Sequence, residues 1–114
     1  MPRSSVVTRL PEFADARYSL GSVYARIDRV ADAINELRAS LALEPRHFRA
    51  NLLLGRILTL QNQGTAALPH LRTAVDVDPR SSEAFAFLAD AYDKVGNRAE
   101  AATARQRARD LSKK

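Results

Sequence analysis

The chain has 114 residues, no cysteine and a formal net charge of +5. This length suits one modest domain, and the lack of cysteine excludes disulfides, thiolate metal sites and a cysteine nucleophile. No apolar run is long enough to cross a bilayer, and the N-terminus lacks the apolar core of a signal peptide. We therefore expect no membrane insertion, and the cytoplasm is the favoured compartment.

Residues 1–13 are the least regular part of the sequence. Pro11 lies 34 residues before Pro45, and three apolar residues precede it: Val6, Val7 and Leu10. This leader is either a frayed terminus or the end of a helix from a preceding repeat. In the second case its apolar residues would form an edge that joins another unit.

Two helices joined by a short turn are predicted for residues 14–47. Apolar residues recur at spacings of three and four from about Glu12 to Ile27, and again from Val30 to Leu41. This pattern indicates one buried face on each of two helices. Pro45 ends the second helix, because the residue before a proline disfavours the helical region.

The same order of helix, turn and helix returns in residues 48–81 and 82–114. The second unit turns at 61–64, where Asn62 and Gly64 tolerate the left-handed backbone that a tight turn needs. The third unit starts after Ser81, a good helix-start residue, and turns at 96–97.

Small residues recur with the same period of 34 residues: Gly21, Gly55 and Ala89 in the first helices, and Ala33, Ala67 and Ala101 in the second helices. A period of this length is typical of stacked helical repeats that pack only on their neighbours. The predicted fold class is therefore an all-α solenoid. Arg105 replaces the leucine of the earlier units, which suits a last helix with no successor.

The motifs LGSVY, LGRIL and LADAY, together with the three alanines of the second helices, resemble the tetratricopeptide repeat family over residues 14–114. The resemblance implies three repeats, at 14–47, 48–81 and 82–114, wound into a right-handed superhelix. It also implies that the first helices line a concave groove. The family's tryptophan position departs from the pattern, since it holds Arg17, Asn51 and Phe85.

Grooves of this kind bind extended peptides or helices, so the resemblance implies a protein or peptide ligand. The residues expected to line the groove are Tyr18, Ser22, Arg49, Leu53, Arg56, Leu60, Phe87 and Asp90. An alternative places Leu53 and Phe87 in the core of a tightly wound stack.

A similar subset of the family carries a carboxylate clamp for chaperone C-termini. That clamp needs lysine, arginine and asparagine side chains where this sequence has Tyr18, Ser22, Leu53, Glu83 and Phe87. Glu83 would repel a carboxylate. We therefore do not expect chaperone-tail binding.

No catalytic residue, metal site or cofactor is expected. His47 and His70 are the two histidines, and both are interpreted as surface residues. Six cations lie in residues 98–114, but this segment lacks aromatic residues for stacking on bases, so a nucleic acid partner is not expected. The alternative to a binding scaffold is a structural segment of a longer array or multidomain protein that self-associates through exposed repeat edges.

Overall fold

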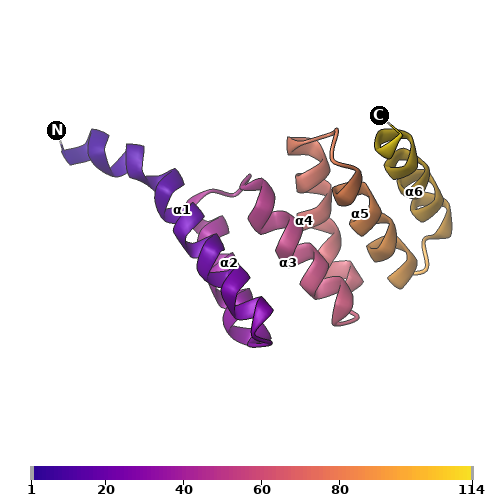
Figure 1. The fold of residues 1–114 in the computed structure, drawn as a ribbon, viewed down its shortest axis with the longest axis horizontal. Coiled ribbons are helices and arrows are strands. Elements are labelled where there is room, and N and C mark those ends of the chain that lie inside the picture. The colour runs from indigo at the N-terminus through magenta and orange to yellow at the C-terminus, as the bar shows by residue number, and fades with distance from the viewer. Residues whose placement is uncertain (1, 114) are drawn as a thin grey trace.

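The computed structural model describes residues 2–113, with side chains from Leu10 onward. Six helices follow one another, and no strand occurs in this part of the chain (Figure 1). The helices are α1 (Pro2–Arg26), α2 (Val30–Leu43), α3 (Phe48–Leu60), α4 (Gly64–Val77), α5 (Ser82–Lys94) and α6 (Arg98–Ser112). The predicted all-α fold is confirmed.

The helices form three pairs that stack in chain order, α1 with α2, α3 with α4 and α5 with α6 (Figure 1). Adjacent pairs pack through α2 on α3 and through α4 on α5. The stack measures 51 × 30 × 21 Å, and its Cα radius of gyration is 15.0 Å. A compact domain of this length would have a radius of about 13 Å. The molecule is therefore an elongated solenoid in which each repeat packs on its neighbours.

The three helix pairs turn at the same register position. Asp28, Asn62 and Gly96 have positive φ angles of 64°, 61° and 83°. The N–H of the following residue then donates to the carbonyl oxygen five residues earlier, with N–O distances of 2.8, 2.8 and 2.9 Å for Arg29, Gln63 and Asn97. This hydrogen bond satisfies a carbonyl group at the C-terminus of each first helix.

Gly64 does not serve the turn, so that part of the sequence prediction is wrong. It is the first residue of α4 and is buried. A Cβ atom on Gly64 would lie 3.0 Å from the Cβ of Lys94 and 3.1 Å from the carbonyl oxygen of Ala91. The missing side chain therefore allows α4 to approach α5 closely.

The first helix is longer than predicted. Residues 2–13, most of the predicted leader, form the first half of α1 without a break. They are therefore not the end of a separate preceding helix. Pro11 removes one backbone N–H and crowds the preceding turn, and the N-terminal part of α1 runs at an angle to the rest (Figure 1). Of the predicted joining edge, Leu10 is half-buried, whereas the side chains of Val6 and Val7 lie outside the described residues.

Within each of the first two repeats, the two helices pack tightly at a glycine of the first helix. A Cβ atom on Gly21 would lie 3.0 Å from the Cγ of Leu37, and one on Gly55 would lie 2.5 Å from the Cγ of Leu71. The third repeat has Ala89 and Arg105 at these register positions. The long side chain of Arg105 reaches out to two carboxylates, at 3.3 Å from Asp90 and 2.7 Å from Asp93.

Candidate binding groove

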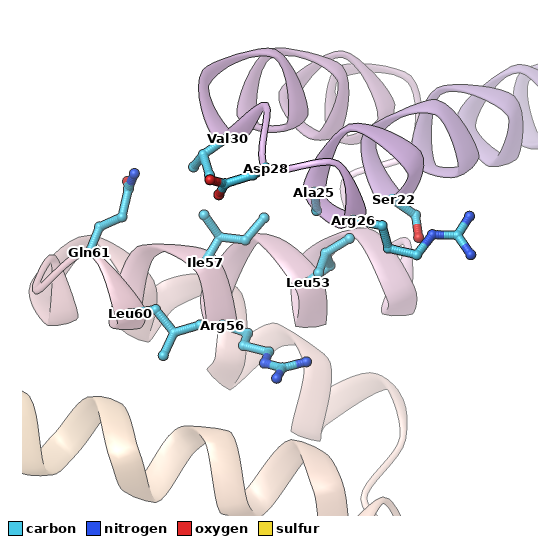
Figure 2. A pocket seen from close by; sticks show the side chains of 10 residues that line it. All are labelled: Ser22, Ala25, Arg26, Asp28, Val30, Leu53, Arg56, Ile57, Leu60 and Gln61. Atoms are coloured by element: carbon cyan, nitrogen blue, oxygen red, sulfur yellow. The ribbon is translucent and has the colours of Figure 1, made fainter.

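Two adjoining cavities lie along the first helices of the repeats and share Leu53 and Arg56. The larger cavity, of about 520 Å³, is lined mainly by α1 and α3 (Figure 2). The smaller cavity, of about 130 Å³, is lined by residues of α1, α3 and α5. We call the two cavities together the α3 groove, because α3 contributes the floor of both.

The structure brings together seven of the eight groove residues predicted from the sequence. The smaller cavity is lined by Tyr18, Arg49 and Phe87, the larger by Ser22 and Leu60, and both by Leu53 and Arg56. Asp90 lines neither cavity. Its carboxylate instead accepts a hydrogen bond from the guanidinium group of Arg105 on α6.

The apolar floor of the α3 groove is continuous with the core. Leu53 and Phe87 are half-buried and pack against the buried core cluster. Each therefore combines features of the two alternatives predicted for it, since one side contacts the core and another lines the groove. Leu60 is much more open, with 69% of its surface exposed.

Arg56 spans the gap between α3 and α5. Its guanidinium carbon lies 5.2 Å from the centroid of the Phe87 ring, a distance at which the ring attracts a cation. Figure 2 shows Arg56 and Leu60 extending from α3 on the side that faces α5. This contact places a positive charge above an aromatic ring inside the groove.

The groove carries more positive than negative charge. Arg26, Arg49 and Arg56 line it and are exposed, and Asp28 and Glu83 are its two acidic residues. Among the described residues, none of the three arginines forms a salt bridge with a carboxylate. Their hydrogen-bond donors therefore remain available to a ligand beside the apolar floor.

His47 links two helices that line the groove and is not the surface residue that the sequence predicts. Only 8% of its surface is exposed. Its Nδ1 accepts the backbone N–H of Ala50 at 3.0 Å, which caps α3, and this leaves Nε2 to donate to Asp15 at 2.6 Å. Its ring centroid lies 5.5 Å from that of Tyr18. His47 therefore joins the start of α3 to α1 and holds Tyr18 beside the smaller cavity.

His70 extends this polar network to α4. It is half-buried, and its Nδ1 donates to the Oδ1 of Asn51 at 3.1 Å. The amide nitrogen of Asn51 in turn donates to the carbonyl oxygens of Pro45 and His47, both at 3.0 Å. Burial, followed by the nearby charge of Arg38, lowers the pKa of His70.

No cluster suited to a metal ion occurs in the described part of the chain, where no three histidine, aspartate or glutamate side chains converge. Within residues 2–113, no helix has the length and apolar character that crossing a membrane requires.

A family model described as tetratricopeptide repeat matches residues 18–69 and 61–113. The chain belongs to the tetratricopeptide repeat family. The resemblance inferred from the repeated motifs is therefore confirmed. A Caenorhabditis elegans protein, tetratricopeptide repeat protein 21 homolog, is 36% identical over 62 residues, which is 54% of this chain and 5% of that protein.

Solved structures show the same architecture. MamA from Desulfovibrio magneticus RS-1, residue 41 to the end, superposes with a TM-score of 0.82 and 30% identity over 86% of this chain and 55% of that one. YrrB, described as a TPR protein with an unusual peptide-binding site, superposes with a TM-score of 0.78 and 23% identity over 86% of this chain and 50% of that one. This tetratricopeptide repeat chain thus spans about half the length of these structures.

Proposed function

We propose that the chain is a non-catalytic scaffold that binds a peptide or a helix of a partner protein in the α3 groove. The observation that carries the proposal is the convergence of Tyr18, Leu53 and Phe87, from three successive repeats, beside unpaired arginines. An apolar floor with a few charged groups around it is typical of ligand sites. The likeness to YrrB, whose description names a peptide-binding site, supports a peptide ligand.

The lining of the groove favours a ligand that presents an apolar side chain next to a carboxylate. Leu53 and Leu60 supply apolar surface, and Arg49 and Arg56 supply guanidinium groups that bind carboxylates through two parallel hydrogen bonds. A chaperone C-terminus is not the proposed ligand, because Glu83 lies in the smaller cavity and none of the clamp residues is present. We propose an internal peptide segment or a helix instead.

The test is selection of peptides against the intact chain, followed by titration of the labelled peptides with variants. Arg56→Glu and Leu60→Ser change exposed residues, so they should leave the helical circular dichroism unchanged. Each should weaken binding about tenfold, the loss expected for 1.4 kcal/mol. The matched control is Arg107→Glu, which reverses an exposed charge on α6 and should change affinity less than about twofold, since an exposed charge distant from the contact contributes little.

The proposal fails if the selected peptides bind Arg56→Glu and Leu60→Ser as tightly as the unchanged chain. It also fails if Arg107→Glu weakens binding equally, because the attraction would then be general to the basic surface. A Leu53→Ser/Phe87→Ser double variant tests the apolar floor of the groove separately. If it keeps its helicity but loses the peptide, at least one of the two residues contacts the ligand.

The alternative function, a structural segment of a longer array or multidomain protein, also stays a proposal. The chain's coverage of only part of each relative is compatible with it. Self-association through a repeat edge predicts a mass that rises with concentration in sedimentation equilibrium, whereas a monomer across the accessible range contradicts it. The exposed apolar side chains of α1 are the surface through which such an association would form.

A further inference from the structure

The first helix exposes a line of large apolar side chains. They are Phe13, Leu20 and Val23 of α1, together with Ile27 directly after its last residue, and their exposed fractions are 48%, 38%, 42% and 59%. Their spacings of seven, three and four residues put them on one face of the helix. Among the described residues they make up four of the six exposed large hydrophobic side chains, so this α1 stripe is a concentrated patch.

The same register positions are buried in the other repeats. The counterparts of Leu20 and Val23 are Leu54 and Ile57 in α3, and Leu88 and Ala91 in α5. None of these four exceeds 8% exposure. Leu20 and Val23 therefore belong to the surface that is buried at both internal repeat junctions and is open in the first repeat. Ile27 lies at the rim of this surface, because its counterparts Gln61 and Val95 remain exposed.

The internal junctions also show what covers this surface, namely the second helix of the preceding repeat. At the second junction, α4 covers α5. A Cβ atom on Gly64 would lie 3.1 Å from the carbonyl oxygen of Ala91, and the guanidinium carbon of Arg72 lies 5.6 Å from the centroid of the Tyr92 ring. At the first junction α2 packs on α3 in the same way, and Val30 shares a cavity with Ile57.

The covering helices share an apolar pattern. Ile34 and Leu41 of α2, and Leu68 and Val75 at the same register in α4, are partly buried against the core. Because repeats are joined by the same kind of contact at every junction, the helix that fits the α1 stripe should carry this pattern. It has aliphatic residues seven positions apart and a small or β-branched residue at its N-terminal end, as Gly64 and Val30 provide.

The opposite end of the stack does not offer such a surface. It presents Ser82, Glu83, Arg105 and Arg109 around a shallow hollow between α5 and α6. Arg105 there is held by Asp90 and Asp93. Placing these charges on the α1 stripe would remove them from water, at a cost that an apolar partner surface does not offset. The two ends of the stack therefore do not match, and head-to-tail stacking of copies is disfavoured.

We propose that the α1 stripe is a docking surface for an amphipathic helix with the apolar pattern of α2 and α4. This site is separate from the α3 groove and extends the stack by one helix. The ligand chemistry is set by the chain's own repeat junctions: an aliphatic face, without charge at its centre, on a helix that lies along α1 as α2 lies along α3.

The probe is the chain's own α2 segment, residues 28–47, as a labelled synthetic peptide. An isolated helix of this length is marginal in water, so a covalent link joins positions 31 and 35, both exposed in α2. Fluorescence anisotropy of this peptide, titrated with the full chain, should show saturable binding. Leu20→Glu and Val23→Glu should each weaken it at least about tenfold, because a carboxylate would be buried at the contact.

The matched control is Val95→Glu, because Val95 is 39% exposed and Leu20 is 38% exposed. This change should leave the affinity within about twofold, since rim and distant residues contribute little. A second control replaces Ile34 and Leu41 of the peptide by aspartate and should abolish binding. Helical circular dichroism verifies each protein variant, and Val23→Glu, at 42% exposed, carries the test if Leu20→Glu loses structure.

Three results would overturn the proposal. The peptide could fail to bind the unchanged chain, or it could bind Leu20→Glu and Val23→Glu as well as Val95→Glu. Sedimentation equilibrium could instead reveal a dimer that Val23→Glu dissociates and that the peptide does not displace. In that case the occupant is a second copy of the chain, paired through α1. The Arg56→Glu result concerns peptide binding in the α3 groove and does not change how these α1 results are interpreted. The two sites are therefore tested independently.

Discussion

Replacing Gly55 by alanine should destabilise the chain, although alanine is the better helix former. In an exposed helix the change gains about 1 kcal/mol. In α3, however, the new Cβ atom would lie 2.5 Å from the Cγ and 2.6 Å from the Cδ2 of Leu71, whereas non-bonded carbon atoms pack at about 3.5–4.0 Å. Leu71 is fully buried, so it can move only by disturbing other core residues.

The magnitude follows from setting these two effects against each other. Forcing an extra methyl group into a packed core costs about 1–3 kcal/mol. After the helix gain is subtracted, Gly55→Ala should lower the free energy of unfolding by about 1 kcal/mol, with about 2 kcal/mol as the upper limit. Gly21→Ala should lower it less, because the nearest atom there, the Cγ of Leu37, is 3.0 Å away.

A double-mutant cycle with Leu71→Ala isolates the contact. Leu71→Ala alone should cost about 2–5 kcal/mol through the cavity that it leaves. In the double variant the new methyl group has room and keeps its helix gain, so that variant should be more stable than Leu71→Ala by about 1 kcal/mol. The coupling energy is then about 2 kcal/mol, well above the error for independent sites.

Urea unfolding of the four proteins, followed by circular dichroism, supplies these free energies. If Gly55→Ala raises stability by the full helix gain, α3 and α4 do not pack as closely as the structure has them. Additive effects of Gly55→Ala and Leu71→Ala would refute the direct contact between the two positions.

Three further predictions concern polar groups. The pKa of His70 is lowered by burial and by Arg38, so the unfolded chain binds this proton first, and stability should fall as the pH drops from about 6.5 towards the lowered pKa. His70→Gln should flatten that part of a plot of urea midpoint against pH, and a flat plot for the unchanged chain would contradict the assignment. Ser81→Ala removes the cap that accepts the Ala84 N–H at 3.1 Å and should cost about 1 kcal/mol, with Ser81→Asp as the conservative control. Arg105→Ala loses two exposed ion pairs and should cost less than about 1 kcal/mol, and a loss that is equal at low and high salt would argue against an electrostatic role.

The repeat period predicted most of the fold, because helix ends in this chain follow local chemistry. The helix predicted for residues 48–60 is the observed α3, Phe48–Leu60, which has an apolar face bounded by a turn and a proline-containing loop. The start of α1 was predicted wrongly because the apolar spacing becomes regular only from about Glu12, after Pro11. A proline removes one hydrogen bond, and here the helix continues through it.

The groove was predictable to the extent that it depends on helix register. A residue such as Leu53 is placed by its spacing from Gly55, and the same spacing places Phe87 one repeat later. Asp90 follows the same spacing, but its carboxylate is taken by Arg105 of α6, and this choice depends on two side chains from different helices. Spacing alone does not reveal it.

The role of His47 was missed for a similar reason. Histidine is not among the residues preferred as helix caps, and its partner Asp15 lies 32 residues earlier in the chain. The sequence does contain one weak signal, since His47 stands directly before the first residue of a strongly periodic helix. Only the packing of α1 beside α3 shows that its second nitrogen has a partner.

The spread of the α3 groove over three repeats links ligand binding to cooperativity of folding. Tyr18, Leu53 and Phe87 belong to α1, α3 and α5, and in a linear stack the terminal units separate from the middle at a low free energy. A ligand that contacts all three side chains binds only while both junctions are closed. Its binding would therefore stabilise the terminal repeats against local unfolding. The size of this stabilisation depends on the concentration and affinity of the ligand.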